Sequence, residues 1–178
     1  MSEIDQLSQL YLFRSVPRPA LQELLTLAPP TRIGMGQSVF EEGATADVAL
    51  LLIQGRLVAS VGTGDNAKQV GDIRPGEIVG EQGLFVPGGL RSARVMAAEP
   101  STALLLTPEL MDHAARNSAI VALEQHLLGT LARRIRATNQ AIQLAWKSDP
   151  LPSKKVETAA APKPRTLRER LSALFGGE

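Results

Sequence analysis

The spacing of apolar residues divides this chain of 178 residues into three parts. In residues 4–14 and 19–28, apolar side chains recur three or four positions apart, which predicts two helices. Prolines at position 17 and at positions 29 and 30 end these helices, because proline disfavours continuation of a helix. We interpret residues 1–30 as a pair of helices that covers the body of a domain.

Short apolar runs separated by glycine-containing turns fill the second part, residues 31–106. The predicted strands are residues 37–40, 48–54, 56–61, 69–73, 93–98 and 102–106. Many short strands at near-even spacing favour an antiparallel barrel or double-sheet roll over a parallel sheet. The glycine-containing residues 62–66 join two such runs rather than open a helix, so we interpret them as a hairpin turn and not as a nucleotide-binding loop.

The helical period returns after Thr107-Pro108. We expect a short helix over residues 108–115 with Thr107 as its N-cap, and a long helix over residues 119–146 that Asn117-Ser118 caps. The long helix carries a narrow apolar seam with spacings of three and four. Its members are Ile120, Leu123, Leu127, Leu131, Ile135, Thr138, Ile142 and Ala145. One small roll cannot cover a seam of this length, so we expect a second copy of the chain as the partner in a homodimer.

The end of the chain changes character twice. Residues 147–164 contain four prolines, two adjacent lysines and an alanine run, which predicts a flexible linker. In residues 165–178, Leu167, Leu171, Leu174 and Phe175 share one helical face. This short amphipathic segment is marginal as an isolated helix. Three interpretations stay open for it: a frayed tail, a helix that docks a protein partner, and a helix that lies weakly on a membrane surface.

The fold class that this pattern predicts is α+β. It consists of an antiparallel, jelly-roll-like β-roll with N-terminal helices and a long C-terminal helix for dimerisation. The expected domains are N-terminal helices in residues 1–30, the roll with its C-terminal helices in residues 31–146, the linker in residues 147–164 and the amphipathic segment in residues 165–178.

Composition narrows the function. The 19 basic and 18 acidic residues balance, so no global field attracts nucleic acid. The absence of cysteine excludes disulfides, iron–sulfur clusters and thiol catalysis. The polar N-terminus is unlike a basic signal peptide, and no apolar run approaches the roughly 20 residues that span a bilayer, so we expect a cytoplasmic protein. The two histidines, His113 and His126, have no metal or catalytic partner nearby in sequence, so we read both as helix-surface residues and expect neither an enzyme nor a metal site.

The chemistry concentrates in residues 80–95, GEQGLFVPGGLRSARV. Backbone N–H groups at the start of a short helix favour an anion, and an arginine can bind two phosphate oxygens at once. A carboxylate accepts hydrogen bonds from ligand hydroxyl groups. The bland alternative is a surface turn with a structural salt bridge between Glu81 and Arg91. The other interpretation is a binding site for a small anion such as a phosphate, which this arrangement of residues suits.

This stretch resembles the phosphate-binding cassette of cyclic nucleotide-binding domains, in particular that of the bacterial cyclic-AMP receptor family. In that family a Gly-Glu-x-Gly/Ala-Leu segment precedes an Arg-Ser/Thr-Ala segment. The turns at residues 41–43 and 53–55 resemble the family too. The resemblance implies that Glu81 takes the ribose 2′-hydroxyl, that Arg91 pairs with the cyclic phosphate, and that Ser92 adds a phosphate bond. It also implies that Gly80 is one of the ligand-binding residues and that the backbone N–H groups of Gly83 and Leu84 donate to the phosphate.

Residues 131–139 resemble the dimer helix of the cyclic-AMP receptors. Thr138 stands where the family's threonine reaches the adenine from the same subunit, and Asn139 stands where a serine reaches it from the other subunit. Arg134, one turn earlier, either approaches the ligand or pairs across the dimer interface. The resemblance covers about residues 10–146. The family's transcription factors continue into a winged helix-turn-helix, whereas only the linker and the amphipathic segment follow Trp146 here, so we expect no nucleic-acid partner.

These observations predict a stand-alone cyclic-nucleotide sensor. The expected ligand is cyclic AMP (cAMP), with cyclic GMP (cGMP) as an alternative, and no cofactor is expected. The sensor would signal through its dimer helix and residues 165–178 to a protein partner. A second hypothesis keeps the fold without the ligand: an interaction adaptor that docks a partner or a membrane surface through residues 165–178.

Overall fold

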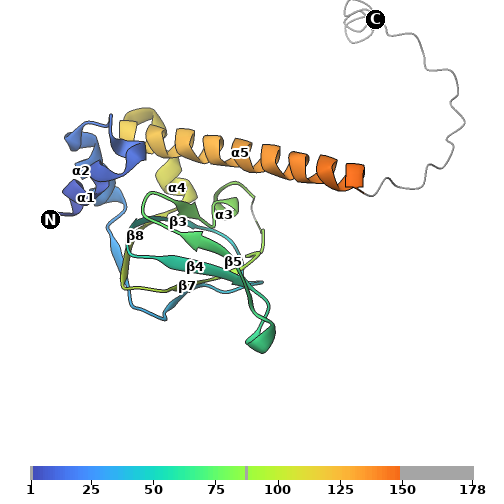
Figure 1. Cartoon of the computed structure of the whole chain (residues 1–178). Coiled ribbons are helices and arrows are strands. Elements are labelled where there is room, and N and C mark those ends of the chain that lie inside the picture. The colour runs from blue at the N-terminus through green and yellow to red at the C-terminus, as the bar shows by residue number, and fades with distance from the viewer. Residues whose placement is uncertain (1, 87, 149–178) are drawn as a thin grey trace, which may run out of the picture. The chain divides into compact units, whose positions relative to one another are not determined.

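The computed structural model describes residues 2–86 and 88–148. These residues fall into two units, of which the first ends at Arg134 and the second begins at Ile135. The first unit contains both sheets and all helices except the later part of the last one (Figure 1). Residues 149–164 of the predicted linker and the whole amphipathic segment lie outside the described residues, so they stay predictions. The predicted start of the linker at residue 147 was wrong by two residues, because the last helix continues to Ser148.

The N-terminal layer consists of α1 (Glu3–Gln9), a 3-10 turn (Tyr11–Phe13) and α2 (Arg18–Leu27). The sequence predicted one helix across residues 4–14, but the chain is extended at Leu10 and tightens into the 3-10 turn after it. The apolar residues Leu7, Leu10 and Phe13 keep a spacing of three across this break. All three side chains are buried in the core beneath the helices.

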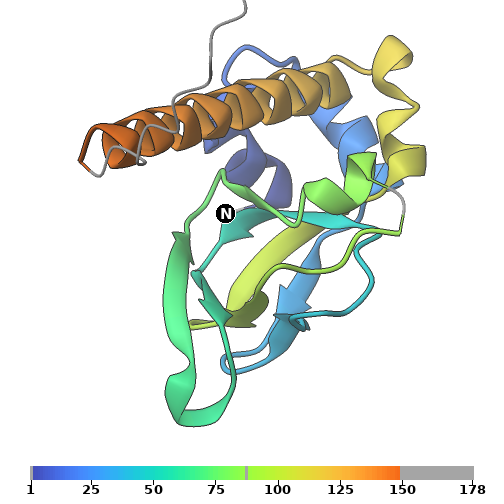
Figure 2. The ribbon, with the colours of Figure 1, turned by 90° about the vertical axis from the view of Figure 1, so that its right-hand side faces the viewer.

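Two four-stranded antiparallel sheets form the roll, as the strand pattern predicted. One sheet has the order β1-β8-β3-β6 and the other β2-β7-β4-β5. The strands are β1 (Thr31–Ile33), β2 (Ser38–Phe40), β3 (Ala49–Gln54), β4 (Leu57–Val61), β5 (Lys68–Ile73), β6 (Ile78–Val79), β7 (Arg94–Ala97) and β8 (Ser101–Leu106). The sequence missed β1 and β6, which are only three and two residues long. The predicted hairpin is the one that joins β4 and β5, at the end of the roll away from the N-terminal helices (Figure 2).

Strand β3 separates two hydrophobic cores. Its residues Leu51 and Ile53 pack with the helices, whereas Leu50 and Leu52 pack between the sheets. All four are buried because successive side chains of a strand point to opposite faces. Full burial of a leucine or isoleucine side chain is worth about 1.5–3 kcal/mol, so this strand holds the roll and the helical layer together.

Both predicted helix caps are present. The Thr107 side chain accepts from the Leu110 N–H at the start of α4 (Pro108–Met111), which a 3-10 turn (Ala114–Arg116) follows. The Asn117 side chain caps α5 (Ser118–Ser148) by accepting from the Ala119 N–H at 2.8 Å. Its amide also donates to the Ala20 carbonyl oxygen and to the Glu23 carboxylate, which fixes the start of α5 against α2.

The apolar seam of α5 is buried only at its start. Ile120, Leu123 and Leu127 pack in the helical core, but Ile135 and Ile142 in the second unit are exposed. No other element of the described residues covers Ile135 and Ile142, so this part of the predicted seam is exposed. No helix of the described residues is both long and apolar enough to span a membrane.

Candidate functional site

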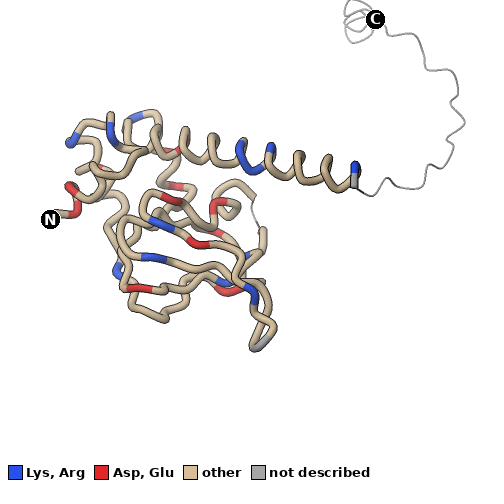
Figure 3. The backbone as a smooth tube through the Cα atoms, in the orientation of Figure 1, with Lys and Arg blue, Asp and Glu red and all other residues tan. Residues whose placement is uncertain are grey.

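A pocket of about 510 Å³ lies in the first unit between the 80–95 stretch, strand β5 and the first half of α5. Its wall contains Gly80, Glu81, Arg91, Ser92 and Arg134, five of the nine residues singled out from the sequence. Charged residues of both signs are interspersed over the two sheets (Figure 3). The acidic Glu81 and the basic Arg91, ten residues apart in sequence, thus lie at the same cavity as Arg134 of α5.

Arg91 is held at the pocket by its backbone and by its guanidinium. The Arg91 N–H donates to the Ala44 carbonyl oxygen at 2.8 Å, and the Gly43 N–H donates to the Arg91 carbonyl oxygen at 2.8 Å. The Arg91 side chain is only 5% exposed, and one guanidinium nitrogen lies 3.6 Å from the carboxylate of Asp47, which is 77% exposed. Burial lowers the pKa of Arg91 from its usual value because desolvation disfavours the cation, and the Asp47 charge opposes this shift. A buried cation with one distant, solvated counter-charge favours an anionic ligand.

Glu81 is the buried acid of the site. Its side chain is 6% exposed and accepts a hydrogen bond from the Arg134 guanidinium of α5, whose side chain is 56% exposed. A buried carboxylate requires such a partner, since an unpaired charge in a poorly solvated site is costly. Sequence reasoning left two interpretations for Arg134, ligand approach and pairing across an interface. In this chain Arg134 pairs with Glu81.

Two glycines shape the cassette. Gly80 has a φ of +79°, and a Cβ there would lie 2.6 Å from an Arg91 guanidinium nitrogen. A Cβ on Gly83 would lie 2.9 Å from the backbone of Ala46 and Asp47, so the short helix α3 (Gln82–Phe85) can approach that loop only with glycine at this position.

The backbone donors proposed for the phosphate already have acceptors within the cassette. The Gly83 N–H donates to the Gly80 carbonyl oxygen at 3.1 Å, and the Leu84 N–H donates to the Glu81 carbonyl oxygen at 3.1 Å. A phosphate would have to share or replace these bonds. Their role as phosphate donors therefore stays a prediction, as does the hydroxyl bond from Ser92, which is exposed at the pocket wall.

Thr138 and Asn139 lie on the part of α5 that belongs to the second unit, and both are exposed. The wall of the pocket in the first unit is formed by residues up to Arg134. Contact of Thr138 or Asn139 with a base stays a prediction.

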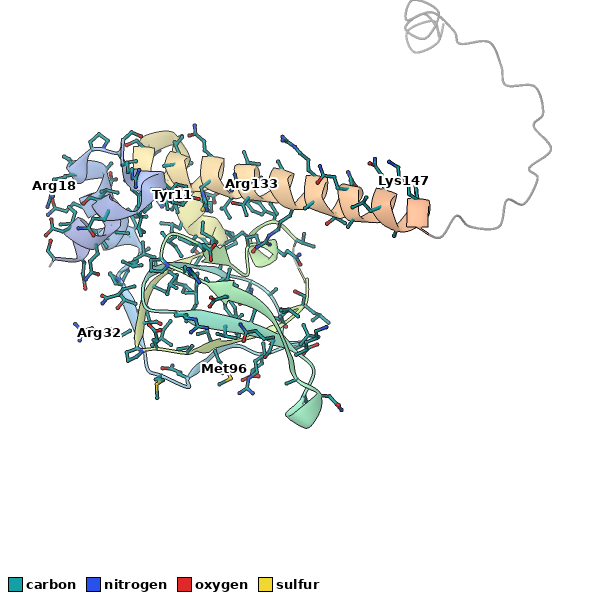
Figure 4. The ribbon with its side chains drawn as sticks, viewed as in Figure 1. Tyr11, Arg18, Arg32, Met96, Arg133 and Lys147 are labelled. Atoms are coloured by element: carbon teal, nitrogen blue, oxygen red, sulfur yellow. The ribbon has the colours of Figure 1, made fainter. Side chains whose placement is uncertain are left out.

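Sequence reasoning missed a polar pair at the pocket wall. The Tyr11 hydroxyl lies 2.7 Å from Nδ1 of His126, and Tyr11 sits beneath α5 (Figure 4). Burial lowers the pKa of His126, the charge of Arg133 lowers it further, and the carboxylate of Glu77 opposes the shift. His126 was read as an ordinary surface residue, and no local signal could correct this, because its partner is 115 residues away in sequence. His113 is exposed as expected, and the described residues contain no cluster of metal-ligating side chains.

Comparison with known proteins identifies the fold family. The profile of the cyclic nucleotide-binding domain matches residues 30–118, which are half of the chain. The chain belongs to the cyclic nucleotide-binding domain family. The match includes the cassette, the strands that support it and the cap of α5.

Three proteins illustrate the similarity of this chain to known ones. The acetyltransferase Pat of Mycolicibacterium smegmatis is 35% identical over 94 residues, which are 53% of this chain and 28% of Pat. A mutant of the cAMP-binding acyltransferase from Mycobacterium smegmatis is 29% identical, with a TM-score of 0.53 over 61% of this chain and 34% of that one. The catabolite activator protein of Thermus thermophilus shares the fold at a TM-score of 0.62 and 24% identity, over 75% of this chain and 62% of that one. This chain thus spans about a third or less of the acyltransferases that it matches.

Proposed function

We propose that this chain is a cyclic-nucleotide sensor whose ligand is cAMP. The observation that carries the proposal is the buried Arg91 guanidinium, which shares one pocket wall with the buried Glu81 carboxylate. A cyclic nucleotide offers the matching groups in one molecule, a phosphate anion and a ribose hydroxyl. The similarity to a cAMP-binding acyltransferase supports this ligand class and favours cAMP over cGMP.

The chemistry of binding follows from the two charges. Arg91 donates to the phosphate oxygens and gains a counter-charge that the solvated Asp47 supplies only weakly. Glu81 accepts from the ribose 2′-hydroxyl. Since Glu81 already accepts from Arg134, the hydroxyl must share or displace that bond.

This exchange offers a route from ligand to α5. Arg134 belongs to α5, so a ligand that changes the Glu81–Arg134 pair changes the free energy of α5 in its present position. A ligand shifts a conformational equilibrium only by its difference in affinity for the two states. We propose that α5 pairs with α5 of a second copy along its exposed seam, that Thr138 and Asn139 contact the base, and that residues 165–178 carry the signal to a protein partner in the cytoplasm.

Calorimetry on the purified full chain with cAMP, cGMP and cyclic di-GMP tests the ligand. We expect cAMP to bind most tightly and Arg91→Ala to abolish measurable binding. Arg94→Ala is the matched control, because Arg94 lies three residues further along, is 45% exposed and pairs with Glu41 at 3.3 Å outside the pocket. Absence of binding at high micromolar ligand, or equal affinity in Arg91→Ala, would contradict the proposal and favour the adaptor hypothesis.

The output is tested separately. Capture of binding partners with and without cAMP, on the full chain and on a chain truncated after Trp146, should show a partner that depends on both the ligand and the last residues. Sedimentation of the same two proteins measures the proposed homodimer. If the protein sediments as a monomer when cAMP is present well above its dissociation constant, the proposed pairing along the seam is contradicted.

A further inference from the structure

The Arg91 guanidinium lies on the face of an aromatic ring. Its central carbon is 3.7 Å from the centroid of the Phe40 ring, well within the roughly 6 Å over which a cation is attracted to a ring face. Phe40 is the last residue of β2, and the site described so far assigns it no role. It lies at the pocket wall and is 51 residues before Arg91 in sequence.

Gly80, which lies between β6 and α3, contacts both the guanidinium and the ring. One Arg91 guanidinium nitrogen donates to the Gly80 carbonyl oxygen at 3.2 Å. A Cβ on Gly80 would lie 2.6 Å from that nitrogen and 2.7 Å from a ring carbon of Phe40. The ring, the glycine and the guanidinium therefore pack against one another with no room for another carbon atom.

The ring itself is anchored by the roll. Phe40 is half-buried and packs against the core between the sheets, and its backbone pairs with Val95 of β7. The orientation of the Arg91 guanidinium thus depends on a rigid neighbour. The other contacts of the guanidinium are the hydrogen bond to the Gly80 carbonyl oxygen and an ion pair at 3.6 Å with the solvated Asp47, because Glu81 is paired with Arg134.

We propose that Phe40 is a positioning residue for the phosphate-binding arginine. A ring face attracts the guanidinium without accepting its N–H groups, so the donors stay available to an anion. A carboxylate in the same place would neutralise the cation and compete with the phosphate. This inference rests on the proposed binding of a cyclic nucleotide and adds the residue that prepares Arg91 for it.

Fluorination of the ring tests the proposal with little change of shape. Phe40 is replaced by 4-fluoro-, 3,5-difluoro- and 3,4,5-trifluorophenylalanine, each of which weakens the negative potential of the ring face. We expect cAMP affinity to fall in steps along this series and to fall roughly 3- to 30-fold in Phe40→Leu. The same series at Phe85, an exposed phenylalanine of α3, is the control and should leave the affinity unchanged.

If Phe40 acted only by packing, cAMP affinity would fall in Phe40→Leu but would not depend on the number of fluorine atoms on the ring. Equal affinity across the fluorinated series at position 40 would therefore overturn the proposal, as would wild-type affinity in Phe40→Leu. The melting temperature of each variant shows that it is folded before its affinity is compared.

A second measurement needs no ligand. In ¹H–¹⁵N spectra of arginine side chains, the Arg91 Nε–Hε signal, assigned by its loss in Arg91→Lys, should be displaced by the ring current of Phe40. It should move toward the unperturbed position in Phe40→Leu and stay in Phe85→Leu. An unmoved signal in Phe40→Leu would overturn the stacking, whereas failure of wild-type protein to bind cAMP would overturn the proposed function and leave the spectrum to decide the stacking.

Discussion

Replacing Arg91 by methionine should separate the stability of this domain from its function. Methionine keeps an unbranched side chain that fills the buried space but removes the charge and all donors. The Arg91 side chain is 5% exposed, so its cation has lost most of its hydration in the ligand-free protein. We expect Arg91→Met to weaken ligand binding severely and to leave the folded state as stable as the wild type or more stable.

The two magnitudes follow from the contacts. A cyclic phosphate that accepts two charge-assisted bonds from Arg91 loses about 1.5–3 kcal/mol for each, so cAMP affinity should fall at least about 100-fold. In the ligand-free protein the variant loses one charge-assisted bond to Gly80, worth about 1.5–3 kcal/mol, and the stacking on Phe40, worth about 0.5–1 kcal/mol. The ion pair with the exposed Asp47 adds less than about 1 kcal/mol. Relief of a desolvation penalty of several kcal/mol offsets these losses.

Calorimetry with cAMP and urea denaturation without ligand measure the two effects in the same variant. Arg94→Met, on the exposed arginine of β7, is the control and should change neither quantity by much. A loss of more than about 2 kcal/mol of unfolding free energy in Arg91→Met, with affinity reduced only in proportion to the unfolded fraction, would show that Arg91 is a structural residue and refute the reasoning.

Three further predictions concern single contacts. Glu81→Gln should weaken cAMP about 10- to 100-fold but change the affinity for 2′-deoxy-cAMP much less in calorimetry, because the deoxy ligand lacks the hydroxyl that donates to Glu81; equal losses for both ligands would contradict this role. The pKa of His126 lies below its ordinary value of 6.5, so the unfolded state takes up a proton before the folded state does, and the free energy of unfolding should fall as the pH drops below about 6.5. Urea denaturation at several pH values should show a weaker pH dependence of this free energy in His126→Gln. The same pH dependence in the variant and the wild type would count against the shift. Gly55→Ala should cost more than about 3 kcal/mol in urea denaturation, because φ is +91° and a Cβ would lie 2.3 Å from Oγ of Ser101. Gly43→Ala, with φ of +77° and open space around it, should cost only about 1–2 kcal/mol, and similar losses for the two glycines would refute the steric argument.

The sequence predicted those parts of this domain that depend on the spacing of residues close together in the chain. The roll followed from alternating runs and glycine turns, and the caps of α4 and α5 followed from Thr107 and Asn117. The break of the first predicted helix at Leu10 was missed, because a 3.6-residue pattern and a three-residue pattern agree over one turn. Strand β6 was missed because two residues carry too little alternation to detect. Strand β1 is as long as the predicted β2, but only one of its three residues, Ile33, is apolar.

The residues of the candidate site also fall into those that the sequence could single out and those that it could not. Glu81 and Arg91 belong to one continuous motif, so the sequence could single them out together, and the structure places both at one pocket. Phe40 and Tyr11 reach that pocket only through the fold, from strand β2 and from the turn after α1. Such residues have no spacing rule relative to their partners. Their contribution can be recognised only once the roll has placed them.

In the proposed mechanism, the contact between Glu81 and Arg134 links ligand binding to α5. A Glu81 carboxylate that is buried in the cassette stabilises Arg134, and with it the first half of α5, in the ligand-free chain. A ribose hydroxyl that takes part of this carboxylate must weaken the pair, unless Arg134 finds new acceptors on the ligand. By linkage, whatever stabilises α5 in another position must change the affinity for the ligand by the same factor. Because α5 continues from Arg134 into the exposed apolar residues Ile135 and Ile142, the partner that covers those residues is the one expected to respond to the ligand.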